Sequence, residues 1–333
     1  MDENRMRFLH VASGTSTTDT IEAAGIPGLR SIWADPLYEG PVPAGLSDDE
    51  LLEVRRRHLA VAEPRASEDP VNDLREWRAV LRRRASYDEL VLWFEHDLFD
   101  QLNLIQLLTW VRDHVAPAPR VSLISIGSFP GRPAFKGLGE LTAGELGPLF
   151  ETRQPVDDRQ FDLAQRAWLA FRAPEPESLD ALRRDDSSAL PYLAAAITRF
   201  MQEYPWVGTG LSRTERRLLE LAGADGVSLA KAFPRMHGGE GAYHVTDATL
   251  VALAAELAST APPLLVITSP GGANSSLLGS TVALTDAGRA VLAGERDRVA
   301  TCGIDRWLGG VHLDGRGGAW RWNDAGQRIV APA

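Results

Sequence analysis

The segment from Leu90 to Leu108, LVLWFEHDLFDQLNLIQLL, constrains the fold more than any other part of the chain. An apolar run ends abruptly at Glu95, His96 and Asp97, and an amphipathic helix begins directly afterwards. An open α/β sheet presents polar groups in this way at the carboxyl end of a strand, which is where such sheets bind ligands. The segment therefore predicts a ligand site at a strand end.

The elements predicted for the first 150 residues favour a mostly parallel, Rossmann-like sheet. Strands alternate with helices, which is the pattern of βαβ units, and the strands are expected at 8–12, 29–33, 90–94 and 121–127. Prolines then punctuate a helical stretch. We predict an α/β sheet domain over 1–150, a helical connector over 151–205 and a further domain over 206–333.

Residues 206–333 have their own pattern, which resembles a winged-helix domain. A Ser-x-x-Glu capping box at Ser212 opens the first of three predicted helices, and two strands and a helix follow. The third helix, between Thr246 and Ser259, holds no Arg, Lys, Asn or Gln with which to read base edges. We expect this domain to dock a protein partner, or a second copy in a homodimer, in preference to DNA.

Charge and composition limit the classes of partner. Residues 1–150 hold 16 Lys or Arg against 23 Asp or Glu, 151–199 hold 7 against 9, and 200–333 hold 12 against 13. No segment is basic, which disfavours nucleic-acid binding. No apolar run approaches the roughly 18 residues of a membrane span, and the polar N-terminus is unlike a signal peptide, so we expect a cytoplasmic protein without membrane contact. The single cysteine, Cys302, is expected to be structural.

Polar residues follow the first predicted strand and precede a helix. Ser13, Gly14, Thr15 and Ser16 are candidates for binding an anion, because hydroxyls and free N–H groups meet at a helix N-terminus. The run lacks the glycines of a dinucleotide site and the lysine of a P-loop, so an ordinary N-cap at Ser16 or Thr18 is the alternative. His10, inside the strand, is either a ligand contact or a core histidine.

Carboxylates follow the next two strands. Asp35 has the spacing from Gly14 of a ribose-binding acid in a dinucleotide fold, or it caps a turn in its own loop. Glu95 and Asp97 would share one face of an extended chain, where one carboxylate raises the pKa of the other and suits the pair to acid and base roles. Alternatively, Asp97 is simply the N-cap of the next helix.

The following helix carries two amides, Gln101 and Asn103, among leucines, so we expect at least one of them to face the site. A metal site formed by Glu95, His96, Asp97 and Asp100 is disfavoured because their spacing matches no standard zinc pattern. We therefore expect no metal.

Tryptophans, arginines and paired glycines gather in the C-terminal segment 303–324. The segment predicts a β-hairpin that turns at Asp314 and Gly315. Its aromatic side chains either pack to anchor the chain end or, with His312, line a pocket.

Four motifs mark the chain: H-x-x-x-G-x-S at His10, Gly14 and Ser16, D-P-L-x-x-G-P from Asp35 to Pro41, W-F-E-x-D-L-F-x-Q-x-x-L from Trp93 to Leu104, and R-W-L-G-G-V-H-L from Arg306 to Leu313. Together they resemble a bacterial family described only as a domain of unknown function. The resemblance spans nearly the whole chain. It implies no activity, but its motifs contain the strand-end residues that the physical argument selects.

These features predict an enzyme that acts on a small, polar ligand bearing a phosphate or nucleotide, by hydrolysis or group transfer. The sequence indicates no particular cofactor. The alternative is a regulatory or adaptor protein whose first domain senses a ligand and whose last domain docks a partner. In the enzyme interpretation the roles are acid or base for Glu95, substrate orientation for Asp35 and Asp97, anion binding for Ser13 to Ser16, and a hydrogen bond from Gln101 or Asn103.

Overall fold

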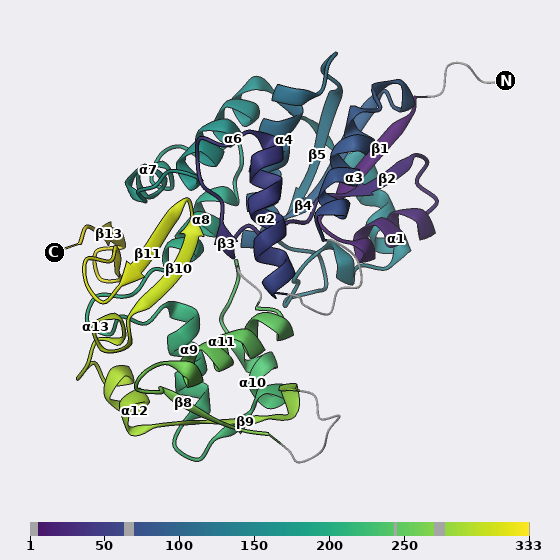
Figure 1. Cartoon of the computed structure of the whole chain (residues 1–333). Helices are drawn as coiled ribbons and strands as arrows, with labels where there is room; N and C mark the ends of the chain where they lie inside the picture. Colours follow the sequence, from purple (N-terminus) through teal and green to yellow (C-terminus); the bar gives the residue numbers. More distant parts are fainter. Residues whose placement is uncertain (1–5, 63–69, 243–244, 270–276, 333) are drawn as a thin grey trace. The chain divides into compact units, whose positions relative to one another are not determined.

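The computed structural model describes residues 6–62, 70–242, 245–269 and 277–332, which form two compact units (Figure 1). The first unit comprises residues 1–196 with 309–311, and the second comprises 197–308 with 312–333. Residues 151–196, which we expected to form most of a connector, are thus counted with the first unit. Within it, helix α6 (Asp158–Phe171) packs against α4 (Leu98–His114).

A five-stranded sheet with the order β2-β1-β4-β5-β6 organises the first unit. The first four of these strands are parallel and β6 is antiparallel, so the predicted mostly parallel α/β sheet is confirmed. Leu92, at the centre of β4, pairs in register with Val11 on one side and Leu123 on the other. The strand bounds are β1 (Phe8–Ala12), β2 (Leu29–Ile32), β4 (Glu89–Glu95), β5 (Arg120–Ile126) and β6 (Gln154–Pro155).

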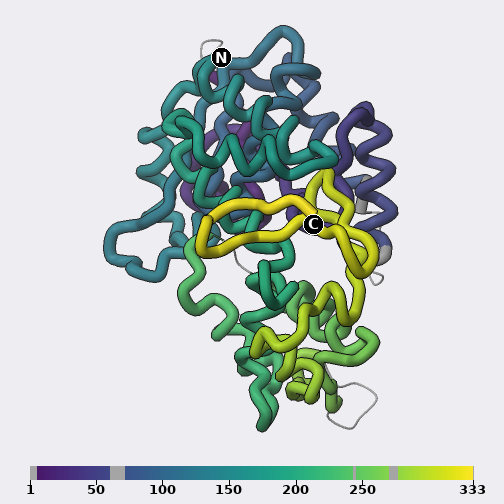
Figure 2. The backbone as a smooth tube through the Cα atoms, turned by 90° about the vertical axis from the view of Figure 1, so that its left-hand side faces the viewer, coloured from purple at the N-terminus to yellow at the C-terminus, as the bar shows by residue number. Residues whose placement is uncertain are grey.

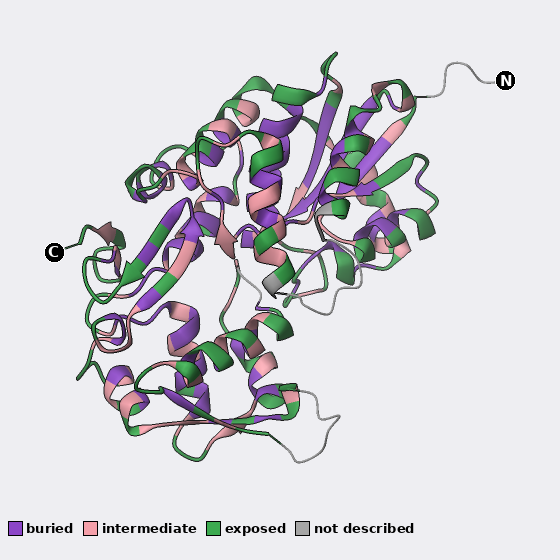
Figure 3. Ribbon diagram, viewed as in Figure 1, coloured by how far each residue is buried: buried purple, intermediate pink, exposed green. Residues whose placement is uncertain are grey.

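Helices cover both faces of this sheet, and every residue of β4 is buried as a result (Figure 3). Val91 and Trp93 pack into a core with Ile21 of α1 (Thr15–Ala23) on one face. The connection β1-α1-β2 moves one way along the sheet, whereas β4-α4-β5 moves the other way. Because both crossovers are expected to be right-handed, α1 and α4 fall on opposite faces.

The first part of the chain contains further helices, the last of which crosses from the first unit into the second. The first two of them are amphipathic and pack against each other. The bounds are α2 (Asp48–Ala62), α3 (Pro70–Arg82), α5 (Ala143–Leu146), α7 (Glu177–Leu182) and α8 (Leu193–Met201).

In the second unit, residues 213–284 run in the order helix, strand, helix, helix, strand, strand, and these three strands form an antiparallel sheet with the order β7-β9-β8. The predicted capping box is present, because Ser212 Oγ accepts the N–H of Glu215 and the Glu215 carboxylate accepts the N–H of Ser212. The bounds are α9 (Arg213–Ala222), β7 (Val227–Ser228), α10 (Leu229–Met236), α11 (Asp247–Ser259), β8 (Leu265–Thr268), β9 (Thr281–Leu284), α12 (Asp286–Leu292) and α13 (Arg298–Cys302).

The chain ends in two hairpins, which lie in the yellow part of the tube in Figure 2. They are formed by β10 (Ile304–Gly309) with β11 (Val311–Gly315), and by β12 (Arg321–Asn323) with β13 (Arg328–Val330). The predicted turn at Asp314 and Gly315 is wrong, because the first hairpin turns at Gly309 and Gly310. Gly309 has a φ of 61°, and a Cβ on Gly310 would overlap the carbonyl oxygen of Arg172.

None of the described helices combines the length and apolar character that crossing a bilayer requires.

Candidate functional site

The strand order creates a topological switch point between β1 and β4. The chain leaves β1 toward β2 on one side, and it leaves β4 toward β5 on the other. Open α/β sheets bind their ligands at such a point, outside the carboxyl ends of the two strands. Here those two ends are followed by Ser13 to Ser16 and by His96 and Asp97.

Glu95, the last residue of β4, is 9% exposed, and its carboxylate is held by the loop after β5. The backbone N–H of Leu138 donates to Oε1, and the N–H of Gly139 also hydrogen-bonds the carboxylate. A Cβ at Gly137 would displace the carboxyl group, so the glycine permits this close approach. The loop and the strand end therefore fix each other.

Asp97 is the N-cap of α4, as the structural interpretation of this residue predicts. Its backbone is extended, and Oδ1 accepts the N–H of Asp100 at 2.8 Å. The buried Asp100 carboxylate accepts the N–H of Glu95 at 2.5 Å and a hydrogen bond from the hydroxyl of Ser13. Gln101 Nε2 donates to the carbonyl of Glu95 at 2.5 Å. Polar groups from both strand ends thus meet at one place.

The pKa values of the two buried acids are raised. Burial is the main cause that raises the pKa of Glu95 to about 8; the charge of Asp97 adds to it, and the N–H groups of Leu138 and Gly139 oppose it. Burial, followed by the charges of Glu95 and Asp97, also raises the pKa of Asp100 well above its ordinary value. A carboxylic acid that is neutral near pH 7 can donate a proton or a hydrogen bond to a ligand.

The first turn of α1 lies beside this cluster. Gly14 is the N-cap and provides no side-chain cap. The expected alternative of an N-cap at Ser16 or Thr18 is wrong, because both residues lie inside the helix. Thr15 and Ser16 are exposed. A Cβ at Gly139 would be 3.3 Å from the Cβ of Ser16, which places the loop that holds Glu95 against this turn.

His10 is a buried core residue, as the alternative interpretation expects. Trp93 Nε1 donates to His10 Nδ1 at 3.1 Å, so Nε2 carries the proton and donates to the carbonyl of Pro27 at 3.2 Å. Burial lowers the pKa of His10 to about 4, which keeps the ring neutral at pH 7. Both ring nitrogens are engaged by the protein.

The carboxylate of Asp35 lies in a buried ion pair with Arg55 of α2, at 2.7 Å between Oδ1 and Nη2. The side chains of Arg55 and Asp35 are only 1% and 4% exposed, and Arg55 also donates to two carbonyls of the same loop. Asn103 donates to the carbonyl of Asp35 and accepts its N–H, each at 2.9 Å. These contacts hold the loop that leads to β3 (Gly40–Pro41).

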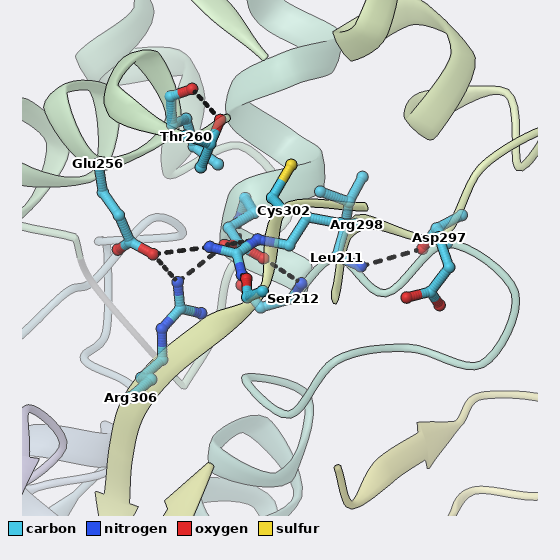
Figure 4. A network of polar contacts seen from close by, with 12 residues as sticks. Leu211, Ser212, Glu256, Thr260, Asp297, Arg298, Cys302 and Arg306 are labelled. Carbon is cyan, nitrogen blue, oxygen red and sulfur yellow. Dashed lines mark hydrogen bonds and ion pairs between the residues drawn. The ribbon is translucent and has the colours of Figure 1, made fainter. Parts of the chain in front are cut away.

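His312, the last candidate, lies in the second unit. Its Nε2 is 2.8 Å from Asp305 Oδ1, and its ring stacks on Trp307 with 4.5 Å between centroids. The neighbouring Arg306 joins a network of ion pairs that links β10, α9, α11 and α13 (Figure 4); its other members are Glu215, Glu256 and Arg298. These contacts match the packing interpretation of the C-terminal segment.

Sequence reasoning missed several residues around Glu95. The sequence indicates Asp100 only as a member of a disfavoured metal site, and it does not indicate the N–H donors of Leu138 and Gly139. Their one local signal is the run Gly-Leu-Gly at 137–139, because glycines often mark a close approach of the backbone. The ring of His96 was also not placed; its centroid lies 6.4 Å from that of Phe135.

Comparison with protein-family models and with curated proteins found no match. Within the described part of the chain, no group of three or more His, Cys, Asp or Glu side chains is arranged to hold a metal ion. The geometry of the site is therefore the basis for assigning a function.

We expect Asp97→Ala to lower the free energy of unfolding by about 0.5–2 kcal/mol, because the N–H of Asp100 loses its cap. Asp97→Ser should retain most of the stability, since a serine hydroxyl also caps. Thermal unfolding of both variants checks this. Equal losses in the two variants would show that the Asp97 charge, and not its capping bond, is what matters.

Proposed function

We propose that the first unit is an enzyme that binds a small, polar ligand at the β1–β4 edge and transfers a proton through Glu95. The supporting observation is a buried carboxyl with a raised pKa at the switch point of an α/β sheet. A buried acid that serves stability alone is usually paired with a cation. Among the ion pairs of the described residues, none involves Glu95.

The first turn of α1 makes a phosphate or nucleotide the favoured ligand class. Its N–H groups have no side-chain cap and suit an anion. Neutral Glu95 and Asp100 would not repel that anion, whereas ionised carboxylates would. Glu95 would then protonate a leaving group or, once ionised, activate a water, which corresponds to hydrolysis or group transfer.

The proposal changes the role of two predicted site residues. Asp35 is engaged by Arg55, and Asn103 by the backbone of Asp35, so both support the neighbouring loop. Asp97 and Gln101 remain beside Glu95: the charge of Asp97 helps to raise its pKa, and Gln101 donates to its backbone carbonyl and so supports the strand end.

Ligand sensing by the first unit with partner docking by the second is a second candidate function. We propose a winged-helix fold for the second unit, supported by its order of helix, strand, two helices and two strands and by the β7-β9-β8 sheet. We also propose membership of the family of unknown function that the four motifs resemble. Either assignment is compatible with an enzymatic first unit.

We predict no sequence-specific DNA binding by the second unit. Helix α11 has no basic or amide side chain, and residues 200–333 carry 12 Lys or Arg against 13 Asp or Glu. A gel-shift assay at physiological salt should show no retarded duplex at submicromolar protein. A shift that survives competitor DNA would contradict this and favour a regulator.

The enzyme proposal is tested by incubating the protein with a defined mixture of nucleoside mono- and triphosphates and p-nitrophenyl phosphate. Mass spectrometry then shows which compounds are converted. We expect one compound to be converted, and Glu95→Gln to slow that conversion by about 10²–10⁴-fold while binding is retained. Glu177→Gln, at an exposed position in the first turn of α7, is the matched control. A compound that raises the melting temperature and returns unchanged would favour sensing, and no binding at all would contradict both functions.

A further inference from the structure

We propose a second binding site in the first unit, in a cavity between α2, α4 and α6, for a small ring compound that carries a carboxylate. The cavity has a volume of about 250 Å³ and is lined by residues of these helices and of the segment before α2. Neither Glu95 nor its neighbours contribute to it. An apolar cavity of roughly 150 Å³ already accommodates benzene, so a ring with one substituent fits here.

Two indoles provide the apolar walls. Trp110 is 4% exposed and Trp168 is 6% exposed, and both line the cavity. Trp110 is held in place because its Nε1 donates to Asp48 at 2.9 Å and the ring of His114 stacks on it. Fixed aromatic walls favour a flat, apolar ligand body, because little side-chain entropy is lost on binding.

One hydrogen-bond donor is presented to the cavity by Gln106, which is 3% exposed. Its Oε1 accepts the N–H of Trp33 Nε1 at 2.8 Å, and this bond fixes which end of the amide is the carbonyl. Nε2 makes no hydrogen bond to the residues that the structure describes, and it is not among their fully enclosed atoms without a partner, so it is open to the cavity that Gln106 lines. A buried amide of this kind is expected to find a partner, and a ligand can provide it.

The second donor is the guanidinium of Arg172. Its Nε and Nη2 donate to the carbonyl of Pro43 at 3.0 and 2.7 Å, and the group lies 5.4 Å from the ring centroid of Trp168. Nη1 makes no hydrogen bond to the described residues. An oriented cation beside a fixed amide donor matches the two oxygens of a carboxylate.

The acids around the cavity do not reverse its preference for a ligand that carries a carboxylate. Asp48 is neutralised by Arg78 at 2.9 Å, in a pair whose side chains are 13% and 4% exposed. Asp113 is exposed at the rim, where water screens its charge. Arg172 is thus the dominant charge facing the interior, and a cationic ligand would be repelled by it.

Three probes of nearly equal size test the proposal: benzoate, benzamide and benzylamine. Ligand-observed saturation-transfer NMR should show benzoate binding to the full chain with a Kd on the order of 1 mM, benzamide binding more weakly, and benzylamine not binding. Benzoate should also change the fluorescence of the tryptophans. Absence of benzoate binding at this concentration, or equal binding of benzylamine, would overturn the proposal.

Two variants then test whether benzoate binds in this cavity. Gln106→Glu keeps the acceptor for Trp33 but replaces the donor with an acid, and Arg172→Met removes the cation. Each should weaken benzoate binding at least about 10-fold. Arg166→Met, which removes an arginine of α6 outside this cavity, is the matched control and should leave binding unchanged. Unchanged binding in a folded Gln106→Glu or Arg172→Met protein would place benzoate elsewhere and refute this site.

Discussion

Replacing Asp35 by alanine is expected to destabilise the first unit by about 3–5 kcal/mol. The change leaves Arg55, whose side chain is 1% exposed, as an unpaired charge in the interior. Three of the hydrogen bonds made by Arg55 end on the Asp35 carboxylate, so the guanidinium cannot be satisfied by the remaining loop carbonyls alone. Urea unfolding followed by tryptophan fluorescence measures the loss.

A double variant separates the free-energy cost of leaving Arg55 unpaired from the net contribution of the ion pair to stability. Asp35→Leu with Arg55→Leu removes both charges and should recover part of the stability lost by Asp35→Ala. The control is Asp88→Asn, which breaks the exposed pair with Arg7 and should change stability little. If Asp35→Ala lowered the free energy of unfolding no more than Asp88→Asn does, the ion pair with Arg55 would not explain why this position holds a carboxylate.

The sheet and its site edge could be predicted because their signals are local. The apolar run of β4 stops at polar residues, and the Asp97 carboxylate caps the helix that begins directly afterwards. Alternation of strands and helices then implies a parallel sheet, and parallel strands bring their carboxyl ends to one edge. The capping box at Ser212 was equally visible, because both of its partners lie within one helical turn.

The partners of the site residues could not be predicted because they are distant in sequence. Arg55 follows Asp35 by 20 residues, and Leu138 follows Glu95 by 43. A pattern of apolar and polar residues shows that such groups are buried or at a strand end, but it does not show which distant group meets them. For Asp35, the spacing that suggested ribose binding instead reflects a loop fastened to α2.

The hairpin turn was misplaced for a related reason. Asp-Gly is a strong local turn signal, yet Gly309 and Gly310 form the turn because the backbone there approaches Phe171 and Arg172 too closely for a Cβ. This constraint comes from tertiary packing and leaves only the paired glycines as a trace in the sequence.

Glu95→Gln should become more stable relative to the natural protein as the pH rises from about 5 to 8. The pKa of Glu95 is raised from 4.5 to about 8 in the fold, chiefly by burial. The folded state therefore keeps a proton that the unfolded state has released over this range, and stability falls as the pH rises through it. The contribution of Glu95 is fully present below its unfolded pKa of about 4.5 and is lost above its folded pKa. Glutamine carries no titrating proton and removes this slope.

The size of this change in stability follows from the pKa shift of Glu95. Each pH unit between the two pKa values costs on the order of 1 kcal/mol, so the difference in unfolding free energy between the two proteins should change by on the order of 4 kcal/mol. Asp100 adds a slope of the same sign, and Glu95→Gln lessens this slope too, because the charge of Glu95 contributes to the raised pKa of Asp100. The control is Glu151→Gln, whose side chain is 81% exposed, and it should retain the natural slope. Urea unfolding at several pH values measures the difference, and parallel curves for Glu95→Gln and the natural protein would mean that Glu95 is already ionised in the fold and cannot be the proton donor at this strand end.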